Sequence, residues 1–126
     1  MKINNLKINK WVTINDINIQ LCVSTNKREM LFDSGEIVDW SKLKNKKISI
    51  RNWKKGDAFR PLGLTKYQKL SDFFINNKIN QFKKEIIPLM IANEEIIWVC
   101  GLRISDKVKV TKKTSEFANL LYKDLN

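Results

Sequence analysis

The organisation of the chain follows from residues 42–84, which read KLKNKKISIRNWKKGDAFRPLGLTKYQKLSDFFINNKINQFKK. Residues 46–53 alternate between apolar and polar side chains, which favours a β-strand. A loop with two glycines and a proline follows over residues 56–63. From Leu70 onward the apolar side chains recur at the spacing of a helix. The stretch therefore predicts a strand, an irregular loop and a helical segment, in this order.

Two short helices are predicted after the loop. The first covers residues 70–77, with Ser71 or Asp72 as its N-cap, because a short polar side chain at this position accepts a hydrogen bond from the first turn. The second covers residues 80–86 and is expected to be capped by Asn80. A proline two residues later marks its end.

Most of the remaining chain is predicted to form strands. Their expected positions are residues 7–14, 17–23, 29–32, 36–40, 89–92, 96–100 and 108–110. Turn residues at 15–16 join the first two strands, and residues 93–95 join the pair that starts at Leu89, so both pairs are expected to be β-hairpins.

A C-terminal helix is predicted in residues 112–126, over residues 115–125, capped by Ser115. Its apolar residues share one helical face: Phe117, Leu120, Leu121 and Leu125. Because strands dominate and the helices are few and short, the fold class is α+β, a small β-rich domain of antiparallel hairpins or sandwich-like sheets. We expect one domain over residues 1–126, with leading strands in 1–49 and a motif region in 50–111.

Positive charge is concentrated in the stretch quoted above. The chain has a formal net charge of +11. Residues 42–84 hold thirteen lysines and arginines against two acids, Asp57 and Asp72, so this third of the chain accounts for the whole excess. Since Trp53 and Phe59 interrupt the charges, the stretch is too apolar for a disordered tail. It is typical of a folded surface that meets a polyanion.

Composition argues against several other functions. The chain has no histidine, which removes the most common general base and every Ser-His or Cys-His arrangement. Its two cysteines, Cys22 and Cys100, lie in separate apolar runs and are expected to be buried, reduced thiols rather than zinc ligands. No apolar run approaches the ~18 residues of a membrane span, and the N-terminus does not resemble a signal peptide, so we expect a cytoplasmic protein without membrane contact.

Three phrases in the second half of the chain occur in a specific order. They are IRNWKKGDAFRPLG (50–63), KLSDFFINNKI (69–79) and PLMIANEEIIWVCGLRISDKVKVT (88–111). Their order and spacing resemble the C-terminal domain of bacterial tRNA(Ile)-lysidine synthases. Each phrase alone is weak evidence, whereas the combination is specific, and the residues before position 50 match the less patterned strands of that family.

The resemblance implies a ligase that uses ATP and Mg²⁺ to attach lysine to C2 of the wobble cytidine of tRNA-Ile. In that family the chemistry belongs to an N-terminal domain with a Ser-Gly-Gly-x-Asp-Ser phosphate loop. This sequence has no such loop, and its four glycines are all separated. We therefore expect a catalytically inactive tRNA-binding part without cofactor, which docks near the tRNA acceptor stem. Its expected partners are tRNA-Ile and the catalytic domain, with a homodimer as a further option.

Ten basic residues are the candidate tRNA contacts. They are Arg51, Lys54, Lys55, Arg60, Lys66, Lys69, Lys78, Lys83, Lys84 and Arg103. For each of them a solvated basic surface is the alternative to phosphate contact, and Arg103 is also a candidate for interdomain pairing. Phe73, Phe74 and Trp98 are expected in the core, whereas Trp53 and Tyr67 either stack on the nucleic acid or pack beneath lysine side chains.

A second hypothesis from another class remains open. The domain would then be a structural interdomain or dimerisation module, whose bases only keep it soluble. An independent catalyst is the weakest option, because the sequence shows no paired carboxylates, metal cluster or activated nucleophile.

Overall fold

The computed structural model describes residues 1–26 and 35–126 and confirms the predicted α+β class. Within these residues the helices are α1 (Leu70–Asn76) and α2 (Gln81–Lys84), with 3₁₀ helices at Trp40–Lys42 and Asp106–Val108. The strands are β1 (Lys2–Ile3), β2 (Val12–Ile14), β3 (Ile19–Ser24), β4 (Gly35–Asp39), β5 (Ile48–Arg51), β6 (Ala58–Phe59), β7 (Gln68–Lys69), β8 (Leu89–Ala92), β9 (Glu95–Val99), β10 (Arg103–Ile104) and β11 (Phe117–Asp124).

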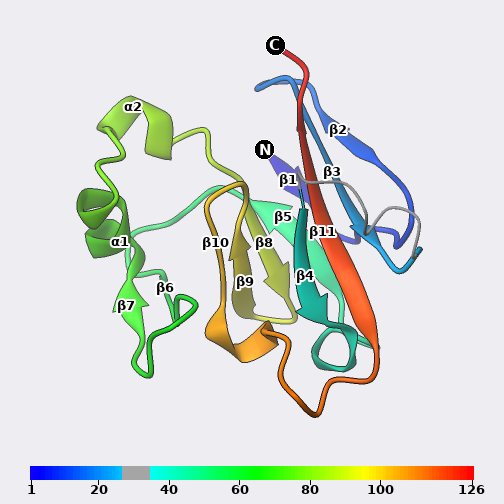
Figure 1. Cartoon of the computed structure of the whole chain (residues 1–126). Coiled ribbons are helices and arrows are strands. Elements are labelled where there is room, and N and C mark those ends of the chain that lie inside the picture. Colours follow the sequence, from blue (N-terminus) through cyan, green and yellow to red (C-terminus); the bar gives the residue numbers. More distant parts are fainter. Residues whose placement is uncertain (27–34) are drawn as a thin grey trace.

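The described strands form three antiparallel sheets. A five-stranded sheet has the order β1-β5-β8-β9-β10, a four-stranded sheet has the order β2-β3-β11-β4, and β6 pairs with β7. Figure 1 shows the five-stranded sheet in the middle, with the four-stranded sheet on one side and α1, α2, β6 and β7 on the other. The five-stranded sheet is therefore covered on both faces.

Strand β8 shows why the middle sheet needs two covers. All four of its residues are buried, a pattern typical of a strand that has packing partners on both faces. Met90 and Ala92 belong to the core between the two large sheets, whereas Leu89 and Ile91 belong to a second core on the helical side. The period of two along one strand thus separates two hydrophobic cores.

The second core positions the helical side of the molecule. Phe59 of β6 and Phe73 of α1 pack edge to face, with ring centroids 5.2 Å apart. Both are buried together with Leu70 and Phe74, which confirms the predicted core role of Phe73 and Phe74. Burial of such side chains contributes about 1.5–3 kcal/mol each, so this core fixes the loop between β5 and α1 against the sheet.

The predicted C-terminal helix is wrong, because these residues form β11. β11 is an inner strand of the four-stranded sheet and pairs with β3 on one edge and β4 on the other. Ala118 and Leu120 are buried in the core between the sheets and Tyr122 packs against it, which is a period of two. Hydrogen bonding to two neighbouring strands overrides the weak helical spacing of the apolar residues.

Two smaller predictions are also wrong. The expected strand at residues 108–110 is absent, since Asp106–Val108 forms a 3₁₀ helix capped by Ser105 and Lys109 follows as extended backbone. Neither Ser71 nor Asp72 caps α1, whose N-cap residue is Lys69 without a side-chain hydrogen bond. The Leu70 amide instead donates to the Asp57 carbonyl oxygen at 2.8 Å, so a neighbouring turn satisfies the start of the helix.

Other local predictions are confirmed. Both expected hairpins form, as β2–β3 and β8–β9, although β2 is shorter than expected. Asn80 caps α2 and accepts a hydrogen bond from the Lys83 amide at 2.7 Å. Cys22 and Cys100 are buried and form no disulfide, and Trp98 is buried. The strand expected at residues 29–32 lies outside the described residues.

Candidate nucleic-acid interface

Nine of the ten predicted contact residues lie between Arg51 and Lys84, the segment that forms β6, β7, α1 and α2. We call residues 51–84 the basic layer. This layer is the cover on the helical side of the five-stranded sheet (Figure 1). The tenth residue, Arg103, begins β10 at the edge of that sheet, and its guanidinium lies 5.8 Å from the ring centroid of Phe73 in α1. The fold thus brings Arg103 against the basic layer.

Arg51 is held by an intramolecular clasp. Its Nη1 and Nη2 donate to the two carboxylate oxygens of Asp57 at 2.9 and 3.0 Å, and Asp57 also accepts from the Lys54 amide at 2.7 Å. Burial alone would raise the pKa of Asp57, but the hydrogen bonds from Arg51 and the Lys54 amide outweigh it, so this pKa lies below its ordinary value. The clasp closes the turn that displays Lys54 and Lys55.

Arg60 bonds to a carboxylate through one terminal nitrogen, whereas Arg51 uses both. Its Nη2 donates to Asp106 at 2.9 Å, while the other carboxylate oxygen of Asp106 accepts from the Gly63 amide at 3.0 Å. Lys109 also lies 3.1 Å from this carboxylate. The Gly63 amide is the main reason why the pKa of Asp106 is lowered, with Lys109 and Arg60 acting in the same direction against burial. Asp106 is therefore a charged anchor for the loop that carries Arg60.

Trp53 packs beneath a lysine, as one of the two alternatives predicted. The Lys84 ammonium lies 4.6 Å from the Trp53 ring centroid, and this ring packs edge to face against Phe74 at 5.8 Å. Tyr67 is half exposed, donates to Glu95 at 2.9 Å and has the Lys107 ammonium 5.2 Å from its ring centroid. Both aromatic rings hold cations at the surface.

Six lysines of the basic layer are exposed, and none of them forms an ion pair with the residues that the structure describes. They are Lys54, Lys55, Lys66, Lys69, Lys78 and Lys83. Their positions are set by turns and helix ends rather than by partners. Lys78, for example, has a left-handed backbone with φ of 56° directly after α1. The layer thus carries six positive charges that take no part in the ion pairs of the described chain.

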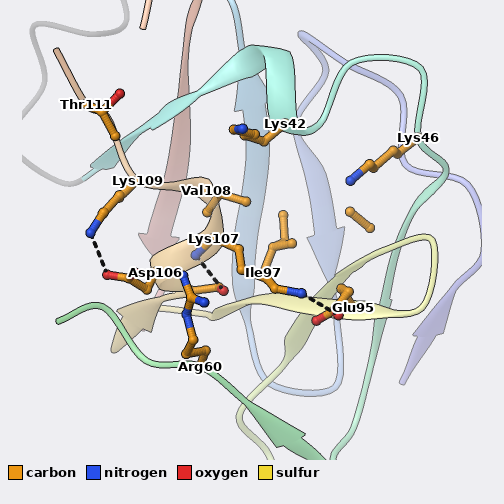
Figure 2. A pocket seen from close by; sticks show the side chains of 12 residues that line it. Lys42, Lys46, Arg60, Glu95, Ile97, Asp106, Lys107, Val108, Lys109 and Thr111 are labelled. Atoms are coloured by element: carbon orange, nitrogen blue, oxygen red, sulfur yellow. Dashed lines mark hydrogen bonds and ion pairs between the residues drawn. The ribbon is translucent and has the colours of Figure 1, made fainter. Parts of the chain in front are cut away.

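A pocket of about 470 Å³ lies beside the basic layer, between the two 3₁₀ helices and β9. Figure 2 shows Lys42 and Lys46 on one side of it and Arg60, Asp106 and Lys107 on the other. Sequence reasoning did not select Lys42, Lys46, Lys107 or Lys109 as site residues. Lys42 and Lys46 belong to the charge-rich stretch, but Lys107 and Lys109 lie where acids and bases balance, so the sequence held no signal for them.

Two further observations concern the described residues. In residues 1–26 and 35–126 no group of three or more His, Cys, Asp or Glu side chains is placed to hold a metal ion. No helix among these residues is long and apolar enough to cross a membrane.

The family model and the curated relatives that match this chain refer to the same kind of protein. Residues 48–119 match the model of the family described as TilS substrate C-terminal domain. A tRNA(Ile)-lysidine synthase of Clostridium perfringens is 37% identical over 122 residues, covering 93% of this chain and 26% of that protein. A tRNA(Ile)-lysidine synthase of Caldanaerobacter subterraneus subsp. tengcongensis is 39% identical over 94 residues, covering 72% of this chain and 20% of that protein.

The fold agrees with a solved structure described as "Crystal structure of TILS C-terminal domain". The TM-score is 0.77 at 19% sequence identity, with 100% of this chain and 99% of the other covered. The chain spans about a quarter of the length of the full synthase from Clostridium perfringens. From the matching family model, the relatives and the shared fold we conclude that this chain belongs to the family of tRNA(Ile)-lysidine synthase C-terminal domains.

Proposed function

We propose that this chain is the tRNA-binding C-terminal part of an ATP-dependent tRNA(Ile)-lysidine synthase that acts in the cytoplasm. The relatives that carry this name are much longer than the chain, and the ligase chemistry on the wobble cytidine, with its ATP and Mg²⁺, belongs to a segment outside it. Gly56, Gly63 and Gly101 lie in separate turns with positive φ and form no Gly-rich phosphate cradle. On its own the chain is catalytically inactive and supplies binding.

The exposed lysines of the basic layer are the observation that supports RNA binding best. A-form RNA displays its phosphates and a shallow minor groove, so a protein recognises a stem mainly through shape and backbone contacts. Lysine suits this task because its ammonium is a mobile point charge on a flexible stem. Six unpaired lysines on one cover of the sheet provide such a surface. We assign the acceptor stem of tRNA-Ile as its target.

The ten candidate contacts divide into two groups in this proposal. The six exposed lysines attract phosphates directly. Arg51, Arg60, Lys84 and Arg103 each have an intramolecular partner, namely Asp57, Asp106, Trp53 and Phe73. They shape the surface and add positive potential. Arg60 still offers Nη1 to a phosphate, because Nη2 bonds to Asp106 and Nε is buried.

The test is binding of this chain to transcribed tRNA-Ile across a salt series. Each phosphate contact adds roughly 0.7–0.9 to the slope of log affinity against log salt concentration. If five lysines make contact, the affinity falls about 100-fold or more between 50 and 200 mM salt. Affinity that stays flat with salt, or no binding at 50 mM, contradicts the proposal.

A matched pair of variants assigns the binding to the basic layer. Each variant neutralises four exposed lysines, so both lose the same charge; the test set is K54Q/K55Q/K66Q/K69Q and the control is K2Q/K7Q/K10Q/K123Q. The test set should lower the salt slope by about 3, whereas the control should change it little. Equal effects of the two sets would mean that general positive charge, not this layer, attracts the RNA.

A second candidate function rests on apolar side chains of the same layer. Ile75 of α1 and Phe82 of α2 are 72% and 78% exposed, and such a surface suits contact with another protein body. The domain would then be mainly an interdomain or dimerisation module. Charge reversal at Arg51, Lys55 and Arg60 distinguishes the two functions: unchanged tRNA affinity with a changed size in solution would favour this second function.

A further inference from the structure

The pocket beside the basic layer has a strongly biased charge. Its lining includes five cationic side chains, Lys42, Lys46, Arg60, Lys107 and Lys109, against two carboxylates, Glu95 and Asp106. The excess is three positive charges in about 470 Å³, a volume within the ~300–1,000 Å³ range of small-molecule sites. This volume exceeds what one phosphate group needs, so an attached sugar also has room.

Both carboxylates of the pocket are already neutralised. Asp106 is bonded by Arg60 Nη2, Lys109 Nζ and the Gly63 amide. Glu95 accepts from Lys107 at 3.1 Å and from the Tyr67 hydroxyl. Burial would raise the pKa of Glu95, but these two donors outweigh it and the pKa is lowered, so Glu95 stays ionised and holds Lys107 in place. Lys46 acts on Glu95 through space, and Lys42 acts in the same way on Asp39, but neither lysine forms an ion pair with an acid of the described chain.

Lys42 and Lys46 have no ion-pair partner in the part of the chain that the structure describes. Their backbone is nevertheless well fixed. Asp39 caps the 3₁₀ helix of Lys42 and accepts from Ser41. The Lys46 amide donates to the Leu43 carbonyl at 3.0 Å. The backbone of both lysines is thus fixed beside a pocket whose opposite wall carries three cations against two carboxylates.

The floor of the pocket is apolar. Ala92, Ile97 and Val108 line it, and each is at most 3% exposed. Apolar walls keep the local dielectric low, so a charge inside the pocket feels the surrounding cations more strongly than it would on an open surface.

From this arrangement we infer that the pocket between the two 3₁₀ helices binds a phosphate group, and that the RNA backbone supplies this phosphate. The inference rests on the proposed function for its source of phosphate, and it adds a specific phosphate site at the border of the basic layer, which contributes Arg60. Lys42 and Lys46 provide the unpaired charges, while Arg60, Lys107 and Lys109 form a positive wall that is already in position.

The first arm of the test uses inorganic phosphate and needs no RNA. Amide shifts of the whole chain are followed by NMR as phosphate replaces chloride at constant ionic strength. Saturable shifts are expected in residues 42–46 and 105–109. The phosphate affinity obtained from them should fall at least five-fold in K42Q/K46Q and return to the wild-type value in K42R/K46R. Shifts that do not saturate, or that are equal in wild type and K42Q/K46Q, overturn the inference.

The second arm identifies the source of the phosphate. With tRNA, K42Q/K46Q should reduce the salt slope by about 0.7–0.9 and the affinity about six-fold at 0.1 M salt, as for the loss of one phosphate contact. The control is K7Q/K10Q, which removes two exposed lysines between β1 and β2. It should change neither the salt slope nor the tRNA affinity in this way. If wild type binds tRNA and both variants behave alike, the RNA backbone is not the source and the inference falls. If wild type binds no tRNA, the proposed function falls instead, and the phosphate titration still decides the pocket.

Discussion

The clasp between Arg51 and Asp57 separates a structural arginine from an RNA contact. Arg51 stands in the motif region among exposed lysines, yet both of its terminal nitrogens bond to one carboxylate. We predict that Arg51→Gln lowers the stability of the domain and leaves the salt slope of tRNA binding unchanged. K54Q/K55Q, in the turn that the clasp closes, should do the opposite.

The expected magnitude follows from burial and geometry. The Arg51 and Asp57 side chains are 23% and 13% exposed, so the pair is partly shielded from water. Hydrogen bonds to charged groups contribute about 1.5–3 kcal/mol, and removal of one partner leaves the other side chain unsatisfied. Allowing for the remaining solvent contact, Arg51→Gln should cost about 2–3 kcal/mol in the free energy of unfolding.

Urea unfolding of wild type, R51Q, D57N and the double variant measures this energy directly. The two single changes disrupt the same interaction, so the double variant should lose less than the sum, with a coupling of about 1–2 kcal/mol. The tRNA salt series on the same four proteins supplies the second readout. A stable R51Q protein with a salt slope reduced by about 0.8 would contradict a structural role for Arg51, because Arg51 would then bind phosphate rather than its own loop.

Three further outcomes test other parts of the structure. Asn80→Ala should make amide exchange in α2 about five-fold faster, since a lost N-cap costs about 1 kcal/mol; unchanged exchange rates by NMR would show that the cap is irrelevant. Gly101→Ala should lower the melting temperature more than Gly56→Ala, because both glycines have positive φ but only the new Cβ at Gly101 would meet Tyr122, at 3.3 Å; equal shifts in thermal unfolding would count against that contact. The lowered pKa of Asp57 contributes stability above its unfolded pKa of about 3.9 that is lost as the pH falls through the lower folded value. Urea unfolding between pH 5 and 2 should therefore show a steep loss in wild type and a shallower one in D57N, and parallel curves would contradict this.

Local patterns in the sequence were sufficient to predict an element where a single packing partner or a nearby residue determines its structure. The alternation around Ile48 and Ile50 predicted β5, and the spacing of Leu70, Phe73 and Phe74 predicted α1, because each set buries one face against a single core. Asn80 predicted the start of α2, because its side chain accepts a hydrogen bond from an amide only three residues later. These features depend on chemistry within one turn of chain.

The C-terminal strand was missed because its partners are distant in sequence. Leu120 and Leu121 suit either a helical face or a strand buried on both faces, and periodicity alone does not distinguish the two. The choice is made by β3 and β4, which lie far toward the N-terminus and provide the hydrogen bonds on both edges of β11. Nothing within the last segment itself contains that information.

The candidate site also combines features that local sequence predicts with features that depend on distant parts of the chain. Excess charge in one stretch was enough to predict the exposed lysines of the basic layer. The pocket beside this layer depends on the packing of the 3₁₀ helix at Trp40–Lys42 against the one at Asp106–Val108, which brings together Lys42 and Lys107 from opposite halves of the chain. The ion pairs of Arg51 with Asp57 and of Arg60 with Asp106 could not be predicted from the sequence either, since they depend on how the turns around the two aspartates fold.

In the proposed function, one cover of the five-stranded sheet, the basic layer, faces the tRNA. Lysine acetylation of the chain, followed residue by residue with and without tRNA-Ile, tests this most directly. We expect protection of the six exposed lysines of residues 51–84 and continued modification of Lys7, Lys10 and Lys123, which lie outside that layer. Equal protection of both groups, or protection of the second group alone, would contradict it.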